Sequence, residues 1–82
     1  MPLFMDVHSL PGATAQAIAE ARMRDLEEQE KYDVRYLRYW VDEERGKVFC
    51  LVEAPNAEAA VSVHREAHGL VADEIYEVLE GS

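Results

Sequence analysis

Six segments with two kinds of periodicity follow one another along this chain of 82 residues, and their order limits the possible folds more than any other feature. Four segments are short and rich in β-branched, aromatic or alternating apolar residues, a composition that predicts β-strands. They cover residues 3–8, 34–41, 47–53 and 74–79. The two longer segments have apolar residues at helical spacing and predict α-helices at 14–31 and 56–69. The resulting order is β-α-β-β-α-β.

Residues at the segment boundaries support this division. Thr14 and Asn56 are suitable N-caps for the two helices. Gly69 is a suitable stop for the second helix. Gly46, in the polar turn between the second and third strands, suits a left-handed backbone conformation, so these two strands are expected to form a hairpin.

The first predicted helix has an apolar arc that we expect to face the core. Its members are Ala15, Ile18, Ala19, Met23 and Leu26. Arg22 falls inside the same arc. A guanidinium there has to reach out to water or find a carboxylate partner, which is a structural role rather than a chemical one.

The order β-α-β-β-α-β is that of the ferredoxin-like α+β fold, in which a four-stranded antiparallel sheet carries two helices on one face. The right-handed crossover rule leaves few other topologies. We expect a single domain of residues 1–82. A domain of this size has a small core, and the uncovered face of its sheet would carry large aromatic residues. We therefore expect a homodimer in which two sheets pack face to face.

Composition narrows the possible partners and compartment. Seventeen acidic residues against eight basic ones give a net charge of −9, which disfavours nucleic acid as a partner. The single cysteine, Cys50, rules out an intramolecular disulfide framework. We find neither a signal-peptide pattern nor an apolar run of membrane-spanning length, and we expect a cytoplasmic protein without membrane contact.

His64 and His68 lie four residues apart in the second predicted helix, so their side chains share one face. The same face carries Ala60 and Val61, and both imidazoles are therefore expected to point into the domain. Buried imidazole nitrogens need partners. A shared metal ion would supply them, and so would a hydrogen-bonded pair within the core.

The predicted topology brings other metal-binding residue types to the same end of the domain. The first strand and the second helix both run towards that end, which places His8 at the same end as His64 and His68. The third strand runs the opposite way, so Cys50 lies in the half nearer to them. Imidazole and thiolate are donors that borderline divalent metals prefer. The convergence predicts a metal site, although each residue alone also has an ordinary structural explanation.

Four stretches carry a resemblance to a known family. They are FMDVHSLPGAT at 4–14, VRYLRYWV at 34–41, VFCLVEAP at 48–55 and HREAHGLVADEI at 64–75. Together they resemble the small bacterial nickel-binding proteins of a domain-of-unknown-function family with a dimeric ferredoxin-like α/β-barrel fold. The resemblance implies a homodimer that binds nickel and serves in metal handling. It implies metal ligation by four residues, with two carboxylates as further candidates: His8, Cys50, His64 and His68, then Asp6 and Glu53.

We therefore expect a nickel-binding protein without catalytic turnover. Nickel is named by the resemblance alone, because Zn²⁺ or Cu²⁺ would also suit these donors. A second hypothesis is a monooxygenase- or isomerase-like enzyme with a cavity lined by Tyr36, Arg38, Trp40 and His8, which rests on analogy with other proteins of the fold. A third is an interaction module whose histidines belong to the core.

Overall fold

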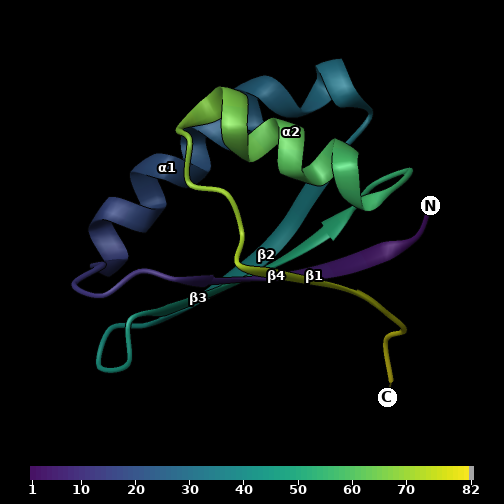
Figure 1. Ribbon diagram of the computed structural model, residues 1–82. Helices are drawn as coiled ribbons and strands as arrows, with labels where there is room; N and C mark the ends of the chain where they lie inside the picture. The colour runs from purple at the N-terminus through teal and green to yellow at the C-terminus, as the bar shows by residue number, and fades with distance from the viewer. Residues whose placement is uncertain (82) are drawn as a thin grey trace.

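A four-stranded antiparallel sheet carries two helices on one of its faces (Figure 1). The structure is a computed structural model that describes residues 1–81. The strands are β1 Leu3–Ser9, β2 Arg35–Asp42, β3 Lys47–Glu53 and β4 Glu74–Val78, in the spatial order β2-β3-β1-β4. The helices are α1 Ala15–Glu28, a 3-10 turn η1 Gln29–Tyr32, and α2 Ala57–Ala67. The predicted ferredoxin-like α+β fold is confirmed.

The two central strands turn alternate side chains towards the helices. In β1 the buried residues include Asp6 and His8, and in β3 they include Cys50. The antiparallel register places Asp6 opposite Cys50. Because directly paired residues point to the same side of a sheet, Asp6, His8 and Cys50 all face the helices.

Both helices begin at the predicted N-caps and α2 ends before the predicted glycine, but α1 is shorter than predicted. The side chain of Thr14 accepts a hydrogen bond from the backbone N–H of Ala17, and that of Asn56 accepts one from Ala59. Gly69, with φ of +80°, follows the end of α2. The first helix ends at Glu28 rather than Lys31, because the chain tightens there into the 3-10 turn. None of the helices within residues 1–81 has the length and hydrophobicity needed to cross a bilayer.

The predicted inward arc of α1 is wrong in part. Ile18 is buried as expected, but the other buried residues of the helix are Ala21 and Asp25. Met23 and Leu26 are 63% and 45% exposed. The helix is rotated about its axis relative to the prediction, because its inner face carries a buried carboxylate that pairs with residues of α2. A pattern based on hydrophobicity counts an aspartate as outward and misses this orientation.

Strand β2 changes its alternation at Leu37. Tyr36 pairs with Val52 of β3, but the next paired residue is Arg38, which leaves Leu37 as the extra residue of a bulge. As a result Tyr36 faces the helices, whereas Arg38 and Trp40 lie on the opposite face. The four residues proposed to line an enzyme cavity, Tyr36, Arg38, Trp40 and His8, are therefore divided between the two faces of the sheet.

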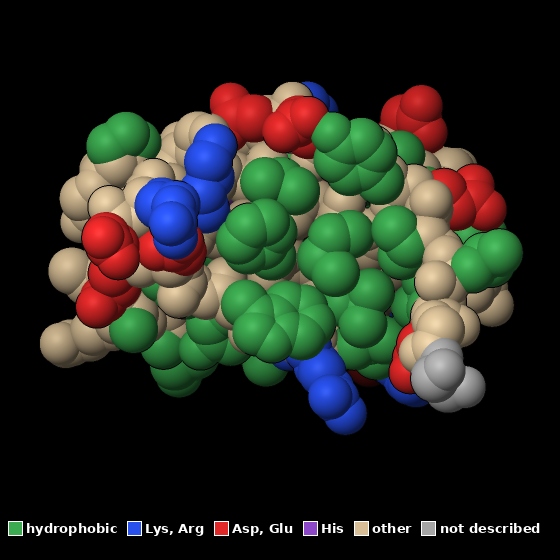
Figure 2. Space-filling view, turned by 90° about the horizontal axis from the view of Figure 1, so that it is seen from below, with side chains coloured by type: hydrophobic (Ala, Val, Ile, Leu, Met, Phe, Trp, Pro, Cys, Tyr) green, Lys and Arg blue, Asp and Glu red, His purple; other side chains and the backbone are tan. Residues whose placement is uncertain are grey.

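The sheet face without helices is largely apolar. Seen from below, it shows a continuous group of hydrophobic side chains with charged residues towards its edges (Figure 2). Register and alternation assign the following side chains to this face: Met5, Val7, Trp40, Phe49, Leu51, Tyr76 and Val78. We call it the outer sheet face. Trp40 and Tyr76 remain about half exposed in the single chain.

Candidate metal centre

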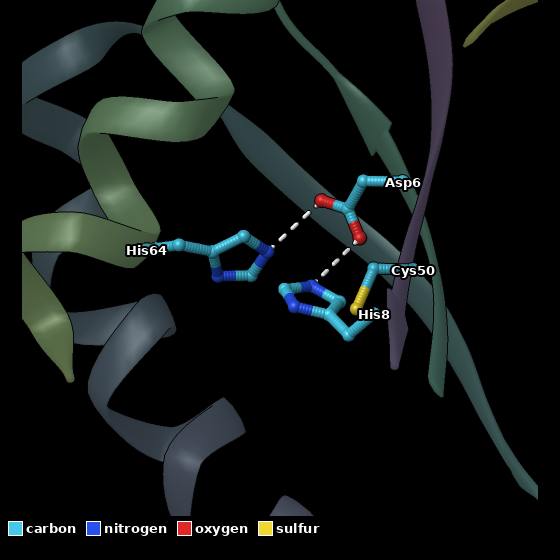
Figure 3. A group of neighbouring side chains, drawn as sticks. All are labelled: Asp6, His8, Cys50 and His64. Carbon is cyan, nitrogen blue, oxygen red and sulfur yellow. Dashed lines mark hydrogen bonds and ion pairs between the residues drawn. The ribbon is translucent and has the colours of Figure 1, made fainter. Parts of the chain in front are cut away.

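Four side chains from three elements meet between the sheet and α2: Asp6 and His8 of β1, Cys50 of β3 and His64 of α2 (Figure 3). One potential ligand atom of each lies within 4.8 Å of the others. Their exposed fractions are 1%, 3%, 7% and 2%. A buried group of one carboxylate, two imidazoles and one thiol is unusual for a hydrophobic core and requires a specific explanation.

Asp6 is the centre of this group. One of its oxygens, Oδ2, lies 2.9 Å from Nε2 of His64, and the other, Oδ1, lies 3.1 Å from Nε2 of His8. Burial alone would raise the pKa of Asp6, but the hydrogen bonds from His64 and His8 outweigh it and lower the pKa to about 2. Asp6 is therefore a carboxylate at neutral pH, with both oxygens directed at imidazoles.

A second group adjoins the first on the side of α1. Oδ1 of Asp25 lies 2.8 Å from Nδ1 of His64 and 3.0 Å from Nε2 of His68. Burial alone would raise the pKa of Asp25, but its hydrogen bonds to the two histidines lower it. Asp25, His64 and His68 also lie close enough together to hold a metal ion.

His64 belongs to both groups, because each of its ring nitrogens faces a different carboxylate. Burial would lower its pKa, but the hydrogen bonds with Asp25 and Asp6 raise the pKa to about 11. The ring also lies 4.7 Å from that of Tyr36, whose hydroxyl donates to the carbonyl of Ala60. In the metal-free protein His64 is thus an imidazolium held between two aspartates.

His68 is oriented by the chain that follows it. The backbone N–H of Leu70 donates a hydrogen bond to Nδ1 of His68, at 3.0 Å. A neutral His68 therefore carries its hydrogen on Nε2 and donates it to Asp25. A metal ion could bind Nε2 only if that hydrogen left. In this arrangement His68 therefore positions Asp25 and has no free lone pair on Nε2 for a metal ion.

Cys50 contributes a protonated thiol in the metal-free state. Burial raises its pKa to about 11, and contact with His64 only partly opposes this effect. The residue is the single free cysteine of the chain. Because thiolate rather than thiol binds metals, Cys50 becomes a ligand only if an ion displaces its proton.

The structure places four of the six residues predicted as ligands in the first group and a fifth, His68, in the adjoining group, and it separates the sixth. Glu53 lies three residues beyond Cys50 in β3, and alternation turns it to the other face of the sheet. It pairs there with Arg35 of β2, at 3.1 Å. Sequence reasoning also missed Asp25. The available signal was its spacing of seven residues from Ile18, which places both on one face of α1.

The first group fits a transition metal ion by donor type and by spacing. Its nitrogen, oxygen and sulfur donors are those that nickel, zinc and copper accept. Two ligands held at about 2.0–2.3 Å from an ion lie at most about 4.6 Å apart. A group that spans no more than 4.8 Å needs only small side-chain movements to close around one ion.

The comparisons with known proteins agree with the fold. The family described as nickel-responsive proteins like SCO4226 matches residues 4–78. The chain is also similar to SCO4226 from Streptomyces coelicolor A3(2), whose crystal structure aligns with a TM-score of 0.91 at 38% sequence identity. That alignment covers 98% of this chain and 99% of SCO4226. No protein of curated function matches the chain. The chain therefore belongs to the SCO4226-like family of nickel-responsive proteins.

Proposed function

We propose that this protein binds a divalent transition metal ion, nickel in the cell, through Asp6, His8, Cys50 and His64. The observation that carries the proposal is the burial of these four donors within 4.8 Å of one another, on side chains from β1, β3 and α2. Asp25 and His68 adjoin the group and would orient His64, or hold a second ion with it. The family description supports nickel over Zn²⁺ or Cu²⁺, which the same donors would accept.

A metal ion would take the place that protons hold in the metal-free protein. With His64 charged, one imidazolium stands between the carboxylates of Asp6 and Asp25. A divalent ion would neutralise both carboxylates, provided that His64 releases a proton. This competition makes nickel binding dependent on pH and separates the proposal from a hydrogen-bonded core network that never releases its protons.

We propose binding without turnover, in nickel handling or homeostasis. The cavity beside the four donors has a volume of about 20 Å³. One water molecule needs about 10–15 Å³, so the cavity suits a ligand of a few atoms rather than an organic substrate. A cysteine ligand also has to stay reduced, which favours the cytoplasm as the compartment.

We also propose that the protein is a homodimer joined through the outer sheet face. The apolar side chains of this face, among them Trp40 and Tyr76, would be covered by the same face of a second copy. Such an isologous contact needs a self-complementary patch, and an apolar sheet face can meet this requirement.

The proposal is tested by titrating metal-free protein, purified without a histidine tag, with Ni²⁺ in a calorimeter. We expect wild type to bind nickel and His64→Asn to lose most of the affinity, because Nε2 of His64 faces Asp6. Glu53→Gln is the matched control, since Glu53 lies on the other face of the sheet and its loss should leave the affinity unchanged. Equal nickel affinity in wild type and His64→Asn would reject the proposed site.

Cys50 is tested in the same preparation by near-ultraviolet absorption. If the thiolate binds nickel, wild type gains a sulfur-to-metal charge-transfer band on loading and Cys50→Ser does not. An identical spectrum for the two proteins would remove Cys50 from the ligand set while leaving the nitrogen and oxygen donors.

A further inference from the structure

The four donors of the proposed metal site are closed off from solvent, since none of them is more than 7% exposed. The cavity beside them is not a ready passage for an ion. Its volume of about 20 Å³ holds little more than one water molecule, and the accessible surface of its wall is largely apolar. A hydrated metal ion can therefore reach the donors only if one of the walls around them moves.

The loop after α2, residues 69–73, is the wall that is least attached to the core. None of its residues is buried, whereas every helix and strand that lines the cavity contributes buried residues. The loop leaves the end of α2 and crosses to the sheet near β4 (Figure 1). Its Leu70 lines the cavity together with Cys50 and His64. A segment without buried side chains opens at a lower free energy than the core elements around it.

The first half of the loop is held by few contacts. Gly69 has a φ of +80°, and a Cβ added there would meet nothing within 4 Å, so the backbone at this point is free of packing. The backbone N–H of Leu70 donates a hydrogen bond to Nδ1 of His68, at 3.0 Å. Gly69 is therefore suited to act as a hinge, and one hydrogen bond keeps Leu70 at the cavity.

The last residue of the loop, Asp73, fastens it to β1 on both sides of His8. The backbone N–H of Asp73 donates to the carbonyl of Val7, at 2.9 Å. Oδ2 of Asp73 accepts a hydrogen bond from the backbone N–H of Ser9, at 2.6 Å. The loop is thus closed onto the strand that carries one of the proposed ligands.

We propose that residues 69–73 form a lid over the metal centre, that Asp73 is its latch, and that nickel enters and leaves when the lid opens. The identity of the ion rests on the proposed function, but the lid is a property of the metal-free protein. Because the same contacts close the lid with and without metal, a weaker latch speeds entry and exit by one factor and leaves the Kd unchanged. Loss of a ligand would change the Kd instead.

The lid is tested without nickel by the rate at which a small uncharged disulfide reagent labels Cys50 in the metal-free protein. Cys50 is the single cysteine and lines the cavity. We expect Asp73→Ala to label about tenfold faster than wild type, the effect of losing one hydrogen bond to a charged acceptor. Asp73→Asn keeps an acceptor oxygen and should be intermediate. Labelling in wild type should be nearly independent of urea below the unfolding transition, because a local opening exposes little surface.

Asp42→Ala is the matched control. Oδ1 of Asp42 also accepts a backbone N–H, that of Arg45 at 3.0 Å, but in the turn between β2 and β3, and Asp42 does not line the cavity. This variant should label as wild type does. Equal acceleration in Asp42→Ala and Asp73→Ala, or a steep urea dependence in wild type, would assign labelling to global unfolding and overturn the lid.

The passage of nickel is tested by stopped-flow association and by chelator-driven dissociation. Both rates should rise about tenfold in Asp73→Ala, with an unchanged Kd. An unchanged labelling rate in Asp73→Ala overturns the lid, and faster labelling with unchanged nickel rates shows that the ion takes another route and also rejects the inference. Faster labelling without nickel binding in any variant rejects the proposed function and supports the lid as the gate to Cys50.

Discussion

Asp6 of β1 and His64 of α2, 58 residues apart in the sequence, are joined by a contact of 2.9 Å between Oδ2 and Nε2. The contact links the sheet to a helix through charged groups where an ordinary core would use hydrophobic packing. On the other side of the ring, Nδ1 of His64 makes an equivalent contact with Asp25 of α1. The three residues tie the main elements of the fold to one buried imidazole, so the stability of the domain and its metal chemistry depend on the same residue.

Replacing His64 by leucine should destabilise the metal-free protein strongly. The substitution leaves Asp6 and Asp25 buried without their imidazole partner, and the loss of one partner from a buried ion pair costs about 3–5 kcal/mol. Urea denaturation at neutral pH measures the free energy of unfolding. Glu53→Gln removes only the largely exposed pair with Arg35 and should cost less than about 1 kcal/mol. A similar small loss in both variants would mean that the buried pairs contribute little.

Stability of the metal-free protein should be highest between pH 3.8 and 6.5. The pKa of His64 is raised from 6.5 to about 11, so its contribution is complete below pH 6.5 and is lost as the pH rises towards 11. The pKa of Asp6 is lowered from 3.8 to about 2, so its contribution is complete above pH 3.8 and is lost as the pH falls towards 2. Free energies of unfolding measured between about pH 2 and pH 11 provide the check. In His64→Leu the decline on the alkaline side should be much shallower, and a wild type that gains stability above pH 6.5 contradicts the prediction.

Nickel binding at pH 7 should release protons. His64 has a pKa of about 11 in the metal-free protein and has to give up a proton to become a ligand. Cys50, whose pKa is also about 11, gives up another if its thiolate binds. Calorimetric titrations in buffers of different ionisation enthalpy count the protons released, and Cys50→Ser should release one fewer than wild type. A binding enthalpy that is the same in every buffer would show that no proton is displaced.

Trp40→Glu should dissociate the proposed dimer. Trp40 lies on the outer sheet face opposite Phe49 of β3, and a carboxylate there would have to be buried between two apolar sheets. Sedimentation velocity should show a dimer for wild type and a monomer for Trp40→Glu. Arg24→Glu, on the outer side of α1, introduces the same residue away from the sheet and should remain dimeric. A monomeric wild type would rule out the interface.

Gly46→Ala should destabilise the protein more than Gly12→Ala does. Both glycines have a positive φ, of +66° and +83°, so alanine is strained at either position by about 1–2 kcal/mol. An added Cβ at Gly46 would also lie 2.8 Å from Cα of Pro11, whereas at Gly12 it meets nothing within 4 Å. This overlap should cost about 1–3 kcal/mol more. Thermal or urea unfolding of the two variants gives the difference, and equal losses would show that the turn moves to relieve the contact.

The fold could be predicted because its signals are local. Strand alternation, helical spacing, the caps at Thr14 and Asn56 and the glycine after α2 each depend on a few neighbouring residues, and together they define β-α-β-β-α-β. The same order predicted that His8, Cys50 and His64 lie at one end of the domain. Once the direction of each element is known, the end of the domain to which a residue belongs is known as well.

Other parts of the site depend on contacts between residues that are distant in the sequence. The inward position of Asp25 depends on imidazoles that reach it from α2, a contact between residues 39 positions apart. The bulge at Leu37 changes which side chains of β2 face the helices, and the neighbouring residues contain no pattern that predicts it. The cavity between Arg22 and His8 exists only after α1 has taken its orientation on the sheet.

The residue pattern alone was enough to infer the class of fold, the acidic charge of the chain and the end of the domain at which its histidines gather. Which donors share one space depended on the packing of the elements, which added Asp25, turned Asp6 towards His64 and left Glu53 on the other face of the sheet. The physical reason is that periodicity reports how each element divides apolar from polar residues. Buried charges are placed by partners from other elements, and these partners meet only when the elements pack.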